Sequence, residues 1–212
     1  MASEVYSAAF LETARQLGAS TLHEASGLPG SAVDPAIRPA WPGAALAGPA
    51  YPVECALGDN LAIHIALETV PRGSVLVVAT GSFLAGYWGE VLTVAAEAAG
   101  VVGLVIDGGV RDVAALAARR FPVFSRGICV HGTLKNCAPS VGEPISLSGT
   151  PVAAGDLVIA DDDGVVVIPA AQAESTLAKG QARADKEAIM MQKLKEGHST
   201  LQLMNLSQWS RR

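Results

Sequence analysis

The sequence predicts an α/β fold in which parallel strands alternate with helices. Three observations favour this fold: half of the 212 residues are hydrophobic, only 5% are aromatic, and short apolar runs alternate with helical patterns through the middle of the chain. A chain of this length can bury a sizeable core within one domain. Because aromatic side chains are few, small aliphatic side chains must form most of that core. We therefore expect a single domain that spans residues 1–212.

The N-terminal part predicts helices on either side of one β segment. Apolar residues recur at helical spacing before Gly18, which is a stop signal, and Ser20 can cap a second, shorter helix. Asp59 and Asn60 can cap a later helix in the same way. The expected elements are helices over 4–17 and 20–26, an irregular crossing rich in Gly and Pro over 27–43, a β segment over 45–56 and a helix that ends at Glu68.

The middle of the chain has the clearest alternation of strands and helices. Apolar runs bounded by glycine or proline are separated by segments with helical periodicity. Strands that alternate with helices in this way favour parallel βαβ pairing. The expected elements are a strand over 74–79, a helix over 90–99, a strand over 101–107, a glycine turn at 108–109, a helix over 112–120 and a strand over 122–125.

After residue 127 the helical patterns give way to short β runs. The acidic segment 161–164 lacks the spaced ligands and the closing Glu of an EF-hand, so we interpret it as a tight β-turn. Pro169 ends the last β run, and a long charged helix follows over 170–196, with Gly197 as its stop. The expected strands are 128–131, 143–147, 156–160 and 165–168.

Composition and charge exclude several classes of function. The net charge is −5 and no basic block is present, so we expect no nucleic-acid partner. No apolar run reaches the roughly 18 residues that a membrane-spanning helix needs, so we expect no membrane partner. The first residues lack a basic start followed by an apolar stretch, and Cys55, Cys129 and Cys137 form no CxxC pair. We therefore expect a cytoplasmic protein with reduced thiols.

The segment from Gly81 to Asp112 carries the strongest indication of a functional site. Glu90, Arg111 and Asp112 lie at the ends of elements that are otherwise apolar, and twenty residues separate Glu90 from Arg111. A helix followed by a returning strand brings the start of the first close to the end of the second. Ligands of parallel sheets gather beyond the carboxyl ends of the strands. This geometry can collect two acids and a cation in one cleft.

Each of these three residues also has a purely structural interpretation. Glu90 stands in a first helical turn, where an acid is favourable in any case. Arg111 can hold a carboxylate with its planar fork, or it can form a surface salt bridge. Asp112 can bind a hard divalent cation through oxygen, or it can be the N-cap of the next helix. The pattern of residues alone does not decide between these roles.

The start of the helix at Glu90 also suits an anion. Gly86 and Gly89 let a ligand approach the backbone closely. The N–H groups of Val91 and Leu92, together with the helix dipole, suit a carboxylate or a phosphate. The alternative interpretation of this segment is an ordinary strand-to-helix loop.

Other polar residues give weaker indications. The four histidines form no zinc spacing, and we interpret His64 as a helix histidine whose hydrogen bonds are satisfied. No apolar strand or acidic partner beside Lys135 favours a Schiff base. The pocket walls are expected from Trp41, Tyr87, Trp88 and the segment 127–137.

The chain resembles a known family in the segment GYWGEVLTVAAEAAGVVGLVIDGGVRDV. This segment is similar to the core of the class II pyruvate aldolases that act on 4-hydroxy-4-methyl-2-oxoglutarate and 4-carboxy-4-hydroxy-2-oxoadipate. These enzymes share the RraA-like superfamily with the regulators of ribonuclease E activity. The resemblance covers most of the chain, including residues 20–25, 58–60, 121–123 and 160–166. It implies an αββα layered sandwich of the RraA-like, swivelling phosphohistidine-domain type.

The resemblance also implies a role for each site residue. Asp112 would be the one direct protein ligand of a divalent cation, Mg²⁺ or Mn²⁺. Arg111 and the backbone of Gly89, Glu90, Val91 and Leu92 would bind a 2-oxo acid substrate. Glu90 would hold a water molecule on the cation, and it stands where the family has Asp, so its carboxylate is one methylene further from the backbone.

The family is trimeric or hexameric, and its sites lie between subunits. The resemblance therefore implies a homo-oligomer in which the C-terminal helix 170–196 lies at a subunit interface. A Glu from the neighbouring subunit's helix would complete the site. Glu187 matches that position, with Glu174 and Glu196 as alternatives.

The implied activity is metal-dependent aldol cleavage of a 4-hydroxy-2-oxo diacid to pyruvate and a second 2-oxo acid. Oxaloacetate decarboxylation would pass through the same enolate. One alternative is a non-catalytic regulator that binds ribonuclease E, although such relatives lack the Asp that this chain keeps as Asp112. A further alternative is a methyltransferase, which the sequence disfavours because it has no glycine-rich methyl-donor motif after a first strand.

Overall fold

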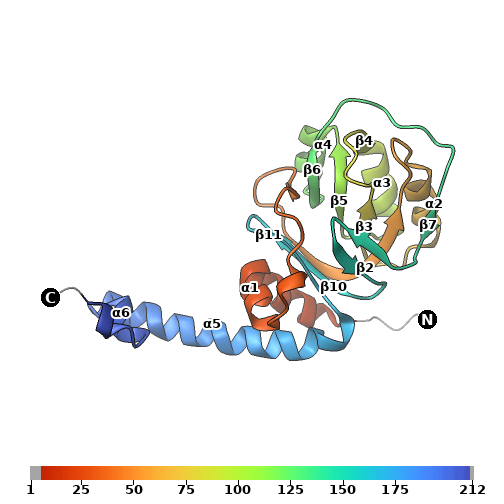
Figure 1. Ribbon diagram of the computed structural model, residues 1–212. Coiled ribbons are helices and arrows are strands. Elements are labelled where there is room, and N and C mark those ends of the chain that lie inside the picture. Colours follow the sequence, from red (N-terminus) through yellow and green to blue (C-terminus); the bar gives the residue numbers. More distant parts are fainter. Residues whose placement is uncertain (1–5, 211–212) are drawn as a thin grey trace.

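The computed structural model describes residues 6–210 and has four layers (Figure 1). The two inner layers are formed by one nine-stranded mixed sheet that curls on itself, with a separate two-stranded sheet beside it. Helices cover both outer faces. The ends of the large sheet approach each other where Ala32 forms an antiparallel bridge with Val166. This is the αββα arrangement that the family resemblance implied.

The elements follow the expected order. The helices are α1 (Ala8–Ser26), α2 (Leu61–Thr69), α3 (Glu90–Ala99), α4 (Val113–Arg119), α5 (Ala173–Lys195) and α6 (Thr200–Leu203). The strands are β1 (Arg38–Pro39), β2 (Leu46–Glu54), β3 (Val75–Ala79), β4 (Gly86–Trp88), β5 (Gly103–Val110), β6 (Val123–Ile128), β7 (Ser140–Val141), β8 (Ile145–Leu147), β9 (Thr150–Val152), β10 (Leu157–Asp161) and β11 (Gly164–Ile168).

The parallel strands form one continuous half of the sheet. The strand order is β1-β6-β5-β3-β2-β10-β11, and β4 pairs with the end of β5. β2, β3, β5 and β6 run parallel, with Val77 opposite Val105, for example. β10 and β11 add an antiparallel hairpin to β2. The expected βαβ pairing is therefore confirmed for the middle of the chain.

Strand periodicity separates three apolar cores. In β3, Leu76 and Val78 face the helices α2, α3 and α4, whereas Val75 and Val77 face the space between the two β layers. The same alternation in β10 directs Leu157 toward α1 and α5. Strands covered on both faces are apolar throughout, as β3 is, because neither side meets water.

The N-terminal helix is bent where the sequence predicted a stop. Gly18 adopts φ 80° and ψ 167° inside α1, so two helical segments meet there. The cap of the second segment is not the predicted Ser20. The backbone N–H of Ala19 donates instead to Oδ2 of Asp161, at 2.7 Å, and Ser20 donates its hydroxyl to Asp163. Residues 4 and 5 of the predicted first helix lie outside the described residues.

The largest correction concerns the glycine turn expected at 108–109. Both glycines lie inside β5, which continues to Val110. A Cβ at Gly108 would lie 2.8 Å from Oγ1 of Thr80, and one at Gly109 would lie 2.5 Å from the carbonyl oxygen of Ala85. The glycines therefore permit close packing of the neighbouring chain rather than a turn. The strand expected over 128–131 also ends at its first residue, and the short strands β1, β4, β7 and β9 were not predicted.

The long charged helix is confirmed as α5, which packs along α1 and then runs beyond it to α6 (Figure 1). Gly180 lies where the two helices cross. A Cβ at this position would lie 2.8 Å from Cδ2 of Leu22 and 3.3 Å from Cδ1 of Leu17. Among residues 6–210, no helix combines the length and the apolar character needed to cross a membrane.

The crossing of α1 and α5 gives a first prediction. Gly180→Leu would force a side chain against the fully buried Leu22. Overpacking lowers the free energy of unfolding by about 1–3 kcal/mol. Replacing a helical glycine raises it by about 1 kcal/mol, and we expect the cost of overpacking to be the larger of the two. Urea unfolding should give a lower midpoint than for the wild type. Ala178→Leu, at an exposed position of the same helix, should leave the midpoint unchanged. A midpoint for Gly180→Leu at or above the wild-type value would contradict close packing here.

Candidate active site

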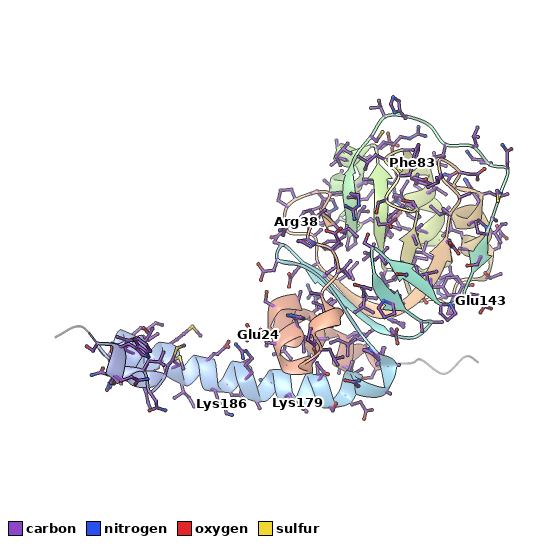
Figure 2. All side chains as sticks on the ribbon, in the orientation of Figure 1. Glu24, Arg38, Phe83, Glu143, Lys179 and Lys186 are labelled. Carbon is purple, nitrogen blue, oxygen red and sulfur yellow. The ribbon has the colours of Figure 1, made fainter. Side chains whose placement is uncertain are left out.

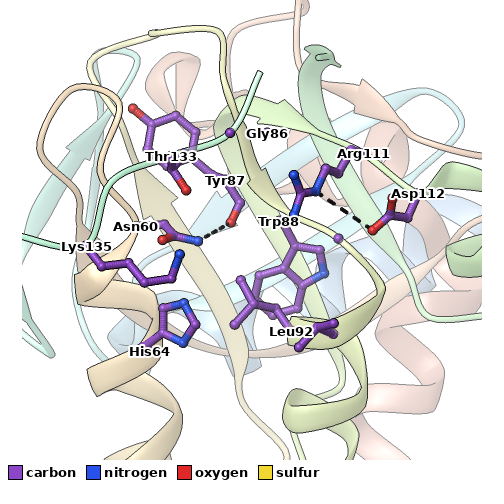
Figure 3. A pocket seen from close by; sticks show the side chains of 13 residues that line it. Asn60, His64, Gly86, Tyr87, Trp88, Leu92, Arg111, Asp112, Thr133 and Lys135 are labelled. Carbon is purple, nitrogen blue, oxygen red and sulfur yellow. Dashed lines mark hydrogen bonds and ion pairs between the residues drawn. The ribbon is translucent and has the colours of Figure 1, made fainter. Parts of the chain in front are cut away.

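A pocket of about 330 Å³ opens where β4 and β5 end and α3 begins (Figure 3). One wall carries Arg111 and Asp112, and the opposite wall comes from α2 and the segment after β6. The side chains of Tyr87, Trp88 and Leu92 lie between the two walls. The lining residues with side chains are Asn60, His64, Tyr87, Trp88, Val91, Leu92, Arg111, Asp112, Thr133 and Lys135.

The structure brings Glu90, Arg111 and Asp112 together as the sequence predicted. The backbone N–H of Arg111 donates to the carbonyl oxygen of Trp88, at 2.9 Å, which joins the end of β5 to β4. Oδ2 of Asp112 accepts the backbone N–H of Glu90 at 3.0 Å and lies 3.9 Å from Nε of Arg111. One carboxylate therefore links the start of α3 to the end of β5.

Asp112 does not cap its own helix with its side chain. Its backbone is left-handed, with φ 58°, and its carboxylate makes no capping hydrogen bond to α4. Only its carbonyl oxygen accepts from α4, through the N–H groups of Ala115 and Leu116. The N-cap interpretation is therefore wrong for the side chain. Left-handed backbone is unfavourable for most residues but tolerated by Asp, and it turns this carboxylate toward α3.

Gly89 is required by the position of that carboxylate. A Cβ at Gly89 would overlap Oδ2 of Asp112 and would lie 3.1 Å from Cγ of Arg111. At Gly86, a Cβ would lie 2.8 Å from the carbonyl oxygen of Cys129. Gly89 has extended backbone angles, with φ −163° and ψ −165°, and Gly86 lies in β4, so the absence of a side chain is what matters at both positions. The pocket wall is built by backbone.

The Glu90 carboxylate points away from the pocket toward α4. Its Oε1 lies 3.2 Å from Nε of Arg119, and Nη1 of Arg119 lies 3.0 Å from Oε2 of Glu97. The Glu90 side chain is not among the groups that line the pocket. Its backbone N–H is at the site, whereas its carboxylate is held in a surface ion pair.

The opposite wall combines the segment 127–137, which was expected at the pocket, with polar side chains of α2 that were not. Asn60 was predicted as a cap, but its Nδ2 donates to the carbonyl oxygen of Tyr87, at 2.9 Å. Asn60 Oδ1 and His64 Nε2 are the only buried side-chain polar atoms without a partner in the described part of the chain. The expectation that His64 is satisfied is therefore wrong. Burial, and then the charge of Lys135, lower the pKa of His64 below its usual value.

Asp59 fixes the segment that carries Lys135. Its Oδ2 accepts the backbone N–H groups of Asn136 and Cys137, at 2.6 and 3.1 Å, and its Oδ1 accepts that of Leu61. Although burial acts to raise the pKa of Asp59, these three N–H groups and the Lys135 charge lower it below its usual value. This carboxylate therefore joins the start of α2 to the loop after β6.

Two aromatic side chains make the floor of the pocket rigid. The Tyr87 hydroxyl accepts the N–H of Gly58 at 2.6 Å, and burial raises its pKa. The indole N–H of Trp88 donates to Oγ1 of Thr93 at 2.7 Å, and its ring stacks on Phe121. Trp41, expected at the pocket, instead donates to the carbonyl oxygen of Phe121.

The donor set suits a cation that keeps much of its hydration shell. No cluster of three or more His, Cys, Asp or Glu side chains that could hold a metal occurs between residues 6 and 210. The half-exposed carboxylate of Asp112 could bind one ion and leave its other positions to water and substrate. Mg²⁺ and Mn²⁺ take oxygen ligands, and Mg²⁺ commonly retains several waters.

Glu187 is not brought to the pocket of its own chain. It lies on α5, in the outer layer formed with α1, and its carboxylate is 2.8 Å from Nε of Arg183. The pocket with Arg111 and Asp112 lies beside α3 and α4, which belong to the opposite outer layer (Figure 1).

Part of the missed wall carried a usable sequence signal. Asn60 and His64 are four residues apart, so they share one face at the start of α2. Lys135 lies in the segment 127–137, whose expected place at the pocket is confirmed, but no pattern in the sequence singled out the lysine itself. The contacts of Asp59 with residues 136 and 137 hold this segment in place.

Comparison with known proteins places this architecture in a family. The model of the RraA-like family, described as Aldolase/RraA, matches residues 19–167. A protein of Halalkalibacterium halodurans, provisionally named 4-hydroxy-4-methyl-2-oxoglutarate aldolase, is 39% identical over 66% of this chain and 68% of its own.

Solved structures agree with this assignment. An uncharacterized protein from Pseudomonas syringae superposes with a TM-score of 0.81 at 26% identity, covering 92% of this chain and 96% of the other. Streptomyces coelicolor RraAS2, described as an unusual member of the RNase ES inhibitor RraA family, has the same fold, with a TM-score of 0.78 at 24% identity and coverage of 88% and 98%. With more than half of its length matched by the family model, this chain belongs to the RraA-like family.

Proposed function

We propose that this protein is a lyase that cleaves a 4-hydroxy-2-oxo diacid into pyruvate and a second 2-oxo acid, with the help of a divalent cation. The observation that carries the proposal is the Arg111–Asp112 pair, which meets the amide end of α3 in one open pocket. The provisional aldolase name of the Halalkalibacterium halodurans relative supports the same reaction class.

Arg111 and α3 would bind the 2-oxo acid. A guanidinium can hold a carboxylate through two parallel hydrogen bonds. The first helical turn offers the N–H groups of Val91 and Leu92, which have no acceptor within the helix, and the positive end of the helix dipole. The backbone of Gly89 and Glu90 completes this end of the pocket. The substrate carboxylate would therefore be fixed beside the Asp112 carboxylate.

Asp112 would hold the cation, Mg²⁺ or Mn²⁺. A bound cation supplies Lewis-acid polarisation of the 2-oxo group. Because Oδ2 of Asp112 accepts the Glu90 N–H, the carboxylate has a fixed orientation before any ion arrives. This preorganisation reduces the cost of binding.

Cleavage breaks the C3–C4 bond while the C4 hydroxyl would give its proton to a water molecule in the pocket, so that C4 becomes the oxo carbon of the second product. The electron pair of the broken bond forms the C2–C3 double bond of pyruvate enolate, and the C2 oxygen becomes an oxyanion. Arg111 would stabilise this developing charge, and Glu90 would position the water that returns a proton to C3. Glu90 must leave Arg119 to do so. Loss of CO₂ from oxaloacetate leaves the same enolate, so the same residues would support decarboxylation.

We also propose that the protein forms a trimer or a hexamer in which Glu187 of one copy reaches the pocket of its neighbour. The outer part of α5 exposes Ile189 and Met191, which are 59% and 55% exposed. Apolar side chains along a helix that leaves the body of the domain favour burial against another surface.

The central experiment measures pyruvate release from 4-hydroxy-4-methyl-2-oxoglutarate with Mg²⁺ and with a chelator. We expect turnover with the ion and none with the chelator. Asp112→Asn keeps an oxygen for the Glu90 N–H but removes the charge, so it should lower turnover at least about 100-fold and weaken Mn²⁺ binding in calorimetry. Turnover that survives the chelator would contradict metal dependence. Ribonuclease E binding without any turnover would support the regulator instead.

Arg111→Lys keeps the charge but loses the planar fork. We expect kcat/KM to fall by a factor that corresponds to a loss of about 2–4 kcal/mol in transition-state stabilisation, as for other groups that stabilise developing charge. Arg15→Lys, on the exposed face of α1, is the matched control and should leave the kinetics unchanged. Equal kinetics for Arg111→Lys and the control would mean that Arg111 acts only in surface ion pairing.

Mixing two inactive variants tests whether the site is shared between subunits. Asp112→Ala and Glu187→Ala proteins should each be inactive, but hybrid oligomers would contain some sites with both acids intact. Activity should therefore recover after subunit exchange, which native mass spectrometry can verify. If hybrids form and activity stays at the parental level, Glu187 is not the partner acid. Repeating the test with Glu174→Ala and Glu196→Ala would show whether another acid, in α5 or at its C-terminal cap, takes this part.

A further inference from the structure

Arg119 binds two carboxylates of α3 at the same time. Its Nε lies 3.2 Å from Oε1 of Glu90, and its Nη1 lies 3.0 Å from Oε2 of Glu97. The two acids are about two helical turns apart, so they share one face of α3. Arg119 lies in the last turn of α4, where the helix dipole also favours a cation. One guanidinium therefore spans α3 from its first turn to its last.

The backbone and the side chain of Glu90 have different partners. The backbone N–H donates to Oδ2 of Asp112 at the pocket, whereas the carboxylate accepts from Arg119 on the outside. The backbone contact keeps the residue at the edge of the pocket, so a change of side-chain rotamer is enough to turn the carboxylate toward the site. The proposed reaction needs the carboxylate there. The contact with Arg119 is thus an idle orientation of a reacting group.

Two features make this idle orientation favourable but reversible. Two carboxylates repel each other at close range unless a cation lies between them, so Arg119 is a better partner for Glu90 than the neighbourhood of Asp112 alone. The side chains of Arg119 and Glu90 are 35% and 47% exposed, so water and salt weaken their attraction. Exposed ion pairs shift an equilibrium by at most about fivefold. The contact can therefore reduce the population with Glu90 in the pocket without preventing its return.

Glu97 acts in the opposite direction to Arg119. When Glu90 turns toward the pocket, Arg119 keeps Glu97 as a partner, so its charge does not lose every carboxylate. Without Glu97, the carboxylate of Glu90 would be the only one that Arg119 contacts among residues 6–210. Arg119 would then hold Glu90 more strongly. Glu97 therefore eases the release of Glu90.

We propose that Arg119 is a positioning residue that holds the Glu90 carboxylate out of the pocket between turnovers, and that Glu97 competes for Arg119 and so releases Glu90. This inference rests on the proposed function, because it concerns when Glu90 is available to position the water of that reaction. The rate would then depend on the balance between two surface ion pairs, and not only on the residues that line the pocket.

The contact can be measured without any turnover. A hydrogen-bonded N–H exchanges with water more slowly than a free one. We expect NMR to show slower exchange for the Nε–H of Arg119 in the wild type than in Glu90→Ala. The Nε–H of Arg120, which forms no ion pair among residues 6–210, is the internal reference. Equal exchange of the Arg119 signal in the two proteins would overturn the inference.

The opposing effects of Arg119 and Glu97 are tested with saturating 4-hydroxy-4-methyl-2-oxoglutarate and Mg²⁺. Arg119→Gln frees Glu90 and should raise kcat about two- to fivefold. Glu97→Gln should lower kcat by a similar factor. Loss of stability would lower the activity of both variants, so opposite signs distinguish positioning from a structural role.

Two exposed residues supply matched controls. Arg120→Gln removes the neighbouring cation, and Glu143→Gln removes an acid between β7 and β8 (Figure 2). Both variants should turn over as the wild type does. A kcat for Arg119→Gln at or below the wild-type value would overturn the inference. A raised value for Arg119→Gln with no decrease for Glu97→Gln would support the role of Arg119 and overturn that of Glu97.

Failure of the proposed function gives a different result. If the wild type releases no pyruvate, the reaction itself is wrong and the inference falls with it, even where NMR detects the contact with Arg119. If the wild type is active and the variants of Arg119 and Glu97 match their controls, the proposed function stands and only the inference fails.

Discussion

The hydrogen bond from the Glu90 amide to the Asp112 carboxylate determines the geometry of the site. It joins the beginning of α3 to the residue pair that follows β5, across 22 positions of the sequence. The left-handed backbone of Asp112 is needed to direct the carboxylate there, and the missing Cβ of Gly89 is needed to leave room for it. Arg111 follows from the same arrangement, because the preceding strand presents it beside the amide end of α3. One acid thus organises the backbone and remains partly exposed to solvent.

The layered fold explains why such an exposed acid can be held so firmly. β3 and β5 are covered on both faces, so they form a stable base for the loops at their carboxyl ends. Gly108 lets the Thr80 side chain approach β5 closely, and Gly109 does the same for the backbone of Ala85. The glycine backbone of β4 and the buried rings of Tyr87 and Trp88 lie between the two walls of the pocket, and the polar side chains come from those walls. Of the charged side chains in residues 6–210, only Arg111, Asp112 and Lys135 line the pocket.

Local patterns predicted much of this structure. The bounds of α3 follow from its glycines and its apolar periodicity, and β3 follows from an uninterrupted apolar run. The meeting of Glu90, Arg111 and Asp112 follows from parallel βαβ geometry. The rest depended on contacts distant in sequence. A glycine pair predicts a turn unless a neighbouring strand needs the space, as at Gly109. Likewise, an apolar neighbourhood made His64 seem a helix histidine with satisfied hydrogen bonds, because the pocket beside it is completed by a loop some seventy residues later.

The cap of the bent N-terminal helix has a consequence for biosynthesis. Ala19 donates to Asp161, a residue 142 positions later in the chain, and Ser20 donates to Asp163 of the same hairpin. The acidic turn between β10 and β11 therefore serves as an anchor for the second half of α1. During translation this anchor does not exist until most of the protein has been made. The ribosome must release nearly the whole domain before the first helix can find its partner, so completion of the fold is delayed until the C-terminal strands arrive.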